Sequence, residues 1–264
     1  TLAGLLMTEA AFLNAVGIFL ISLVRFSGFF LNIPVYSEAI IPMQVKAGLS
    51  ALCAMLILPH LIQTQTLPEL SALEYGLMVI KELVLGFSMG YVVLIIVSAL
   101  RMGGQIIGMQ IGFSFVQVAD PTSNQGLGIV SEFFQLAGSL TFLFVGGHLL
   151  ILRSFFQSFQ QVPLAGVMIN GSIVEEIVLY SRMLFVCGLQ IAMPIIAVIL
   201  VGDVALGIIA RTVPKMNIFQ VGFSLKILGG LAMLIILMPY LGDLIKHLID
   251  LSMNEIQLLL GKMG

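Results

Sequence analysis

The sequence predicts an all-α membrane protein of about six hydrophobic helices. Of its 264 residues, 59% are hydrophobic and only 9% are charged, whereas about 25% of the residues in an ordinary soluble domain are charged. The mean hydropathy is +1.14. The apolar residues also fall in long runs, as helices that span or lie within a bilayer require. Composition and patterning therefore point to the same fold class.

Six apolar runs approach the length of about 20 residues that a spanning helix needs. A seventh segment, residues 243–260, alternates charged and apolar residues at helical spacing and predicts a surface amphipathic helix. We expect one membrane-embedded domain over residues 1–264. The six runs are residues 10–33, 47–62, 75–100, 127–152, 183–209 and 218–241, and the prolines that disfavour helix continuation at their ends are Pro34, Pro42, Pro59, Pro68, Pro163, Pro214 and Pro239.

Charged residues within or beside these runs must face protein or water. Each would cost at least about 2.5 kcal/mol if it faced lipid at the middle of the bilayer. Two interpretations are open: an ion pathway, or pairing that fixes the packing of helices and subunits. The charges are single and of mixed sign rather than a ladder of carboxylates, which favours packing. They are Arg25, Lys46, Lys81, Glu82, Glu132, Asp203 and Lys226.

The sequence contains few candidates for catalytic or metal-binding residues. Residues 86–90 match the G-x-S-x-G pattern of hydrolases, but that motif needs a strand-to-helix turn, and this copy lies inside an apolar helical run. Close packing of small residues explains the pattern better than a nucleophilic Ser88. His60, His148 and His247 are isolated in sequence, so we predict no catalytic residue, metal site or cofactor. A net charge of −2 without a basic patch argues against nucleic acid.

The segment after the third run is unusual. Gly104, Gly108 and Gly112 recur every four residues, so a helix here would have one face nearly without side chains. Phe113, Phe115 and Val116 follow, and then a turn-forming stretch that contains Asp120 and Pro121. Such a loop must be buried in protein or line a cavity, because its backbone groups would be unsatisfied in lipid. It is either a re-entrant packing loop or a constriction in a pore.

Five blocks, in order along nearly the whole chain, resemble the motifs of one known protein family. Residues 41–49 are similar to its I-P-x-x-V-K-x-G-L signature, and 25–28 to its R-x-S-G. Residues 108–121 resemble its Gly-rich loop ending in V-D-P, with Ala119 before the acid, and 147–150 resemble its N-G-H-L-L block, with Gly146 in place of the usual Asn. Residues 214–226 resemble its late P-x-x-N-I-F and V-G-F-x-L-K stretch. The chain thus resembles the FliR family of flagellar export-gate subunits.

The resemblance implies a non-enzymatic subunit of a helical, pore-forming export gate in the bacterial inner membrane, within the flagellar basal body. The gate is built from bent helical hairpins of this chain, FliP and FliQ, with FlhB attached, and it passes unfolded flagellar proteins. Within the Gly-rich segment at about 104–125, residues 106–124 would form a plug. Met109, Phe113, Phe115 and Val116 would close the pore, while Gly104, Gly108, Gly112, Asp120 and Pro121 would provide packing and hinges.

A secondary transporter is the main alternative to a gate subunit. It would use Lys81, Glu132 and Asp203 as coupling residues and bind a small solute near the middle of the membrane.

Overall fold

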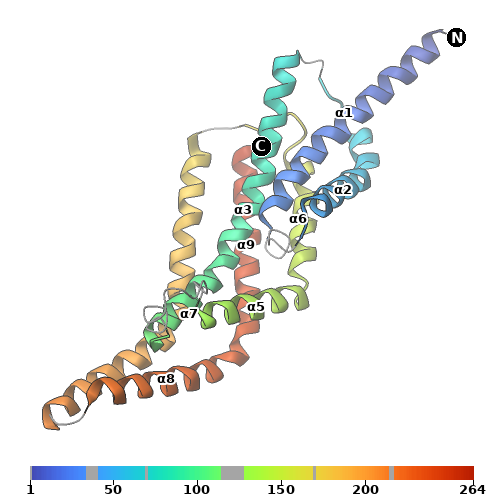
Figure 1. Cartoon of the computed structure of the whole chain (residues 1–264). Coiled ribbons are helices and arrows are strands. Elements are labelled where there is room, and N and C mark those ends of the chain that lie inside the picture. The colour runs from blue at the N-terminus through green and yellow to red at the C-terminus, as the bar shows by residue number, and fades with distance from the viewer. Residues whose placement is uncertain (1, 34–40, 69–70, 114–127, 169–170, 214–216) are drawn as a thin grey trace. The chain divides into compact units, whose positions relative to one another are not determined.

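The computed structural model describes residues 2–33, 41–68, 71–113, 128–168, 171–213 and 217–264. Every regular element in these ranges is a helix, which confirms the predicted all-α fold class (Figure 1). The elements are α1 (Leu2–Asn32), α2 (Met43–Thr64), α3 (Ala72–Ile111), α5 (Ile129–Phe144), α6 (Gly147–Gln161), α7 (Gly171–Thr212), α8 (Ile218–Leu237), the short 3₁₀ helix η1 (Met238–Tyr240) and α9 (Leu241–Met263).

The helices fit a membrane protein. Five segments of the described chain are long and apolar enough to cross a membrane, and α5 with α6 adds a sixth if the pair is counted as one broken span. Helix α3 has 40 residues, which at 1.5 Å per residue gives about 60 Å, twice the thickness of about 30 Å of the hydrocarbon core. Helix α7 has 42 residues. Each therefore runs obliquely or extends beyond the hydrocarbon core.

Several predicted boundaries were wrong. The run 127–152 is two helices, because Gly146 lies in the left-handed region at φ 77° and ends one helical path before α6 begins. Residues 104–111 form the last turns of α3 rather than a loop. Helix α2 continues through Pro59 to Thr64. At Gly146 a single backbone angle decided the boundary, and composition could not reveal it.

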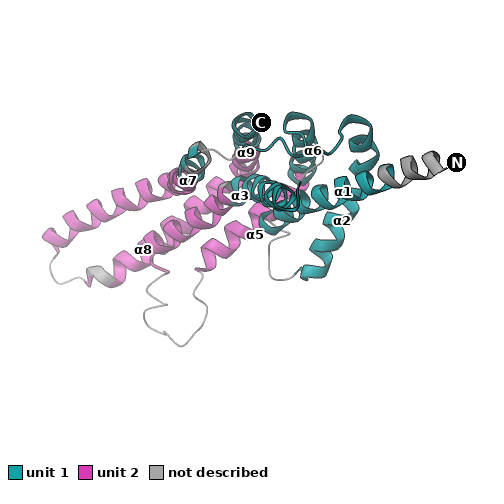
Figure 2. Cartoon of the chain, turned by 90° about the horizontal axis from the view of Figure 1, so that it is seen from above, with its two compact units in different colours: residues 1–94, 146–180, 250–264 teal, residues 95–145, 181–249 magenta. Residues whose placement is uncertain are grey.

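By its internal contacts the chain divides into two compact units, coloured teal and magenta in Figure 2. Unit 1 comprises residues 1–94, 146–180 and 250–264, and therefore contains α1, α2, α6 and parts of α3, α7 and α9. Its core includes closely packed aromatic rings: Phe29 stacks on Phe155 at 4.1 Å, and Phe26 lies tilted against the same ring at 4.6 Å, centroid to centroid. Aromatic pairs at these distances stabilise a core beyond the area that they bury.

Unit 2 comprises residues 95–145 and 181–249. Its helices pack where large apolar side chains meet glycines. A Cβ added to Gly103 would lie 2.8 Å from the Ile191 side chain, and a Cβ added to Gly138 would lie 2.6 Å from that of Leu100. Small residues thus bring α3, α5 and α7 into close contact, as is common in membrane helices. Helices α3, α7 and α9 continue from one unit into the other, and the single membrane-embedded domain remains a prediction.

Helix α9 has the predicted amphipathic character, but its apolar face packs on protein. Ile256, Leu259, Leu260 and Met263 are at most 1% exposed within unit 1. The Met263 carbonyl also accepts a hydrogen bond from the Met168 backbone N–H at 2.9 Å. The end of this helix is therefore part of the core of unit 1 rather than a free face for a membrane surface.

Candidate functional site

The end of α3 contains the first part of the segment predicted to act as a plug. At Gly104 an added Cβ would lie 2.6 Å from the Ser131 Cα of α5, so the backbones of α3 and α5 come close together there. Gly108 faces the Val130 side chain at a looser 3.7 Å. Met109 lies on the opposite, open side of the helix, with 59% of its surface exposed. Gly104 is therefore packed more tightly against α5 than Gly108 is.

Gly112 terminates α3. Its φ is +101°, and its N–H bonds to the Met109 carbonyl at 3.2 Å, while the Phe113 N–H bonds back to the Gly108 carbonyl at 3.0 Å. These two bonds form a Schellman cap, in which glycine is favoured because a side chain would be strained at positive φ. The chain thus leaves the helix at a fixed point, one residue before Phe113.

Phe113 lines an apolar pocket of about 370 Å³ in unit 2. Ile129 and Phe133 of α5 form one wall, and Leu231 and Ile235 of α8 form another. Of the predicted gating and hinge residues, Phe113 therefore lies at an apolar pocket and Met109 lies on the surface of α3. Phe115, Val116, Asp120 and Pro121 lie outside the described residues.

A buried ion pair joins α1 to α3 in unit 1. The Arg25 Nε atom lies 2.5 Å from the Glu82 Oε2 atom, and both side chains are 0% exposed. Two further nitrogens of the guanidinium each donate to the Val162 carbonyl at 3.1 Å, and the guanidinium lies 4.2 Å from the centre of the Phe159 ring. Arg25 and Glu82 thus pair with one another inside unit 1 and have the additional partners that a buried pair needs.

The same pair supports the irregular chain that follows α6. Glu82 Oε1 accepts a hydrogen bond from the Ala165 N–H at 3.3 Å. Gln65, just after α2, accepts from the Leu164 N–H and donates to the Phe159 carbonyl, both at 2.9 Å. Irregular backbone among apolar helices needs such partners, because lipid supplies none. Sequence reasoning did not identify Gln65, since nothing in its local pattern distinguishes it from a loop residue.

A second ion pair, in unit 2, joins α7 to α8. The Lys226 Nζ atom lies 2.9 Å from the Asp203 Oδ1 atom, with side chains 31% and 44% exposed. Among the described residues Lys46, Lys81 and Glu132 form no ion pair; the two lysines are half-buried and Glu132 is exposed in the first turn of α5. Their burial against other subunits remains a prediction. A third ion pair, Lys262 with Glu176, was not predicted.

The G-x-S-x-G pattern is a helix-packing motif. An added Cβ at Gly90 would lie 2.6 Å from the Phe29 carbonyl oxygen, and one at Gly86 would collide with the Arg25 carbonyl. Ser88 is only 3% exposed. The glycines let α3 approach the backbone of α1, and the serine between them is not accessible to a substrate. Packing, the favoured interpretation, is what the structure shows.

Gly146 explains the one visible departure from the N-G-H-L-L block. Its backbone is left-handed, at φ 77° and ψ 21°, and a Cβ there would meet nothing within 4 Å. Glycine adopts this conformation without strain, and asparagine is among the few other residues that adopt it readily. Gly and Asn are therefore both compatible with the left-handed backbone at this position.

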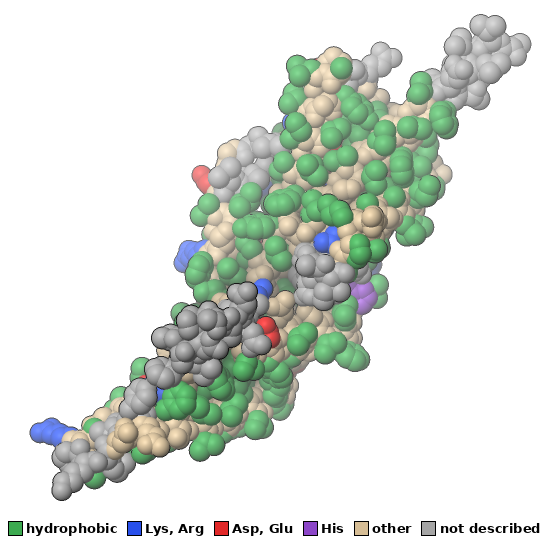
Figure 3. All heavy atoms as spheres, viewed as in Figure 1, with side chains coloured by type: hydrophobic (Ala, Val, Ile, Leu, Met, Phe, Trp, Pro, Cys, Tyr) green, Lys and Arg blue, Asp and Glu red, His purple; other side chains and the backbone are tan. Residues whose placement is uncertain are grey.

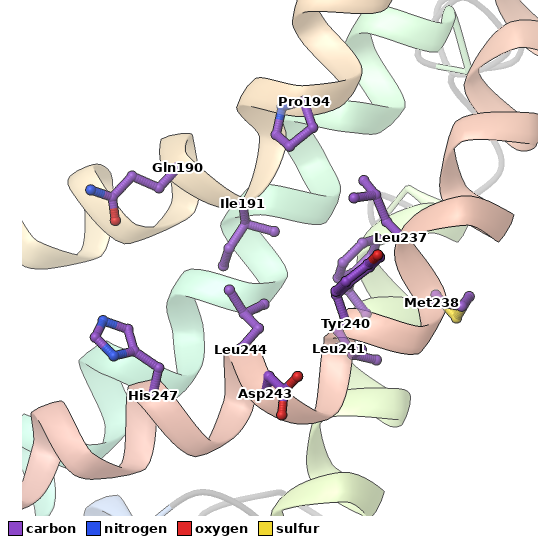
Figure 4. A pocket seen from close by; sticks show the side chains of 11 residues that line it. Gln190, Ile191, Pro194, Leu237, Met238, Tyr240, Leu241, Asp243, Leu244 and His247 are labelled. Carbon is purple, nitrogen blue, oxygen red and sulfur yellow. The ribbon is translucent and has the colours of Figure 1, made fainter.

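A second pocket in unit 2, of about 400 Å³, lies between α7 and the junction of α8 with α9 (Figure 4). Ile191, Pro194 and Leu244 contribute apolar side chains, and Asp243 and His247 contribute polar ones. Within the described part of the chain, no group of three or more His, Cys, Asp or Glu side chains is arranged to hold a metal ion.

Comparison with known proteins gives consistent results. The family described as Bacterial export proteins, family 1, matches residues 16–252. The flagellar biosynthetic protein FliR of Escherichia coli strain K12 is 27% identical over 248 residues, which cover 94% of each chain. FliR of Pectobacterium carotovorum is 30% identical over 235 residues, 89% of each chain. FliR of Bacillus subtilis is 28% identical over 251 residues, 93% of this chain and 95% of the relative.

These similarities cover nearly the whole length of the chain. They agree with its long apolar helices. They also agree with the packing of the motif at 25–28 against α3 and with the left-handed backbone at Gly146. The chain therefore belongs to the bacterial export proteins of family 1, the family of the flagellar biosynthetic proteins FliR.

Proposed function

We propose that this chain is a subunit of the flagellar protein-export gate and forms part of the inner-membrane pore through which unfolded flagellar proteins leave the cell. Membership in the FliR family supports the role in flagellar export. The five to six spans of the described chain support a place in the membrane. We assign the protein to the flagellar basal body on the same grounds of family membership.

We further propose that FliP, FliQ and FlhB are its partners. The surface of the single chain supports an assembly, because hydrophobic side chains cover much of the visible face, with few charges between them (Figure 3). Lys46, Lys81 and Glu132 have no ionic partner among the described residues, and facing lipid would be costly for them.

We also propose that the segment beyond Gly112, up to about residue 124, acts as the plug. The observation that supports this most is the cap at Gly112, which stops α3 at a fixed point and directs Phe113 to the apolar pocket of α5 and α8. Because residues 106–111 belong to α3, we now begin the plug at Gly112 rather than at residue 106. Apolar side chains that pack in such a seat would hold the pore closed until a substrate displaces them.

Deleting residues 113–122 tests the plug and leaves α3 intact through Gly112. We expect the membrane to become leaky to small ions, measured as ion conductance, while the chain still co-purifies with FliP and FliQ. Leu228→Ala, on the exposed surface of α8 (Leu228 is 70% exposed), is the control and should leave conductance unchanged. Unchanged conductance after the deletion would disprove the plug, whereas failure of the unaltered chain to co-purify with FliP and FliQ would disprove the subunit role.

The transporter alternative gains no support from the geometry. It needs Asp203 free to couple to a solute, yet Asp203 is engaged by Lys226. Purification separates the two functions, because a transporter should be recovered as a stable chain that binds a solute, and a gate subunit only together with its partners.

A further inference from the structure

The pocket between α7 and the α8–α9 junction has an apolar floor and a polar rim. Phe134 and Ile191, on the floor, are 4% and 7% exposed. Figure 4 shows the side chains of Ile191 and Leu244 pointing toward one another, with Asp243 and His247 on the same helix as Leu244. Its volume of about 400 Å³ lies within the range of about 300–1,000 Å³ typical of ligand pockets, which combine an apolar lining with a few polar groups.

Two prolines lie in the helices that line this pocket. Pro194 lies inside α7, and Pro239 lies in η1 between α8 and α9. Neither has an N–H, so the carbonyl four residues earlier loses its regular helical partner, and the proline ring displaces the preceding turn. Pro194 itself lines the pocket, as do Met238 and Tyr240, the neighbours of Pro239, and that space is not filled by side chains of the described residues of unit 2.

The pocket also lies where the sequence changes from an almost uncharged helix, typical of the hydrocarbon core, to a charged helix, typical of the headgroup region. Helix α8 has 20 residues with Lys226 as its only charge, and at 1.5 Å per residue it spans about 30 Å, the thickness of the hydrocarbon core. Helix α9 contains charged residues from Asp243 onward. Tyr240, at the junction, is 64% exposed, and tyrosine is enriched at the boundary between hydrocarbon and headgroups. The molecules present at that depth are phospholipids.

We infer that this pocket binds a phospholipid whose headgroup contains a primary amine, such as phosphatidylethanolamine. The apolar floor takes part of an acyl chain. The Asp243 carboxylate pairs with the ammonium group, and a ring nitrogen of His247, one helical turn away, donates a hydrogen bond to a phosphate or ester oxygen. An anionic lipid without an amine would place its negative charge near Asp243 and gain no ion pair. Charge complementarity at the rim therefore selects the amine headgroup.

Photocrosslinking in living cells tests the inference in the native assembly. Benzoylphenylalanine replaces Tyr240 at the rim, and the crosslinked adducts are identified by mass spectrometry. The matched control carries the same photoreactive residue at Leu228, which is 70% exposed on α8 and not part of the pocket. We expect phospholipid adducts at position 240 with a ratio of phosphatidylethanolamine to phosphatidylglycerol about threefold above that at position 228, the size of effect of an exposed ion pair.

Asp243→Asn should bring the lipid ratio at position 240 down to that of the control site, because it removes the carboxylate and keeps the shape of the side chain. Leu244→Phe, which fills the floor, should reduce the total lipid adduct at position 240 and leave position 228 unchanged. A peptide adduct at position 240, no adduct, or a lipid ratio equal to that of the control in the unaltered pocket would each overturn the inference.

Discussion

Arg25 in unit 1 and Lys226 in unit 2 are both cations inside apolar helices, and each pairs with one carboxylate, yet their surroundings differ. The Arg25–Glu82 pair is 0% exposed and also bonds to Val162 and Ala165. The Lys226–Asp203 pair remains 31% and 44% exposed, and no further partner of either charge is seen among the described residues. The same sequence feature therefore has two structural outcomes.

The difference shows what each pair contributes. A buried pair repays the cost of desolvation only when additional hydrogen bonds satisfy its remaining groups, as the backbone of residues 162–165 does for Arg25 and Glu82. A half-exposed pair gains little from charge attraction, because solvent screens it. We therefore expect unit 1 to depend strongly on its pair, and unit 2 to depend on its own pair only weakly in the isolated chain.

Replacing Arg25 with leucine should have the largest effect. The substitution leaves the Glu82 carboxylate buried without its partner, which costs about 3–5 kcal/mol in the free energy of unfolding. Equilibrium unfolding by sodium dodecyl sulfate in mixed micelles measures the loss. Arg25→Lys keeps the charge but not the planar fork of donors, and should recover only part of the stability. Native stability in Arg25→Leu would mean that the buried pair does not support unit 1.

Gln65→Leu tests the remainder of the network of unit 1. It removes the side chain that bonds to both Phe159 and Leu164, so we expect a loss of about 1–3 kcal/mol. Gln161→Leu is the matched control, since its 2.8 Å bond to Gln257 is exposed, and surface changes usually stay within about 0.5 kcal/mol. The same unfolding assay compares the two variants. Equal losses would show that the half-buried position of Gln65 makes its hydrogen bonds no more stabilising than the exposed bond of Gln161.

Asp203→Asn should have the smallest effect, at most about 1 kcal/mol in the purified chain. A double-mutant cycle with Lys226→Met isolates the coupling energy of the two side chains. The same cycle, repeated on the chain bound to its partners, sharpens the comparison. A coupling energy that rises toward the value of the buried pair would show that assembly covers this site. A coupling of several kcal/mol in the purified chain itself would contradict the contrast between the units.

Sequence reasoning succeeded where one local property was sufficient. Apolar runs identified the spanning helices, and the surroundings of Ser88 indicated a packing motif rather than a nucleophile. It failed where a boundary depended on one backbone angle, as at Gly112 and Gly146, because both glycines could equally lie within a helix. It also missed Gln65, whose two partners, Phe159 and Leu164, are about a hundred residues away in sequence.

By itself the sequence determined the fold class, the membrane environment and, through its ordered blocks, the resemblance to the FliR family. These follow from composition, from periodicity and from motifs that are contiguous along the chain. Only the tertiary structure decided which charges meet, that α3 continues to Ile111, and that α7 and the α8–α9 junction enclose one pocket. Those features depend on side chains that are far apart in sequence, and only the packing of helices brings them within bonding distance.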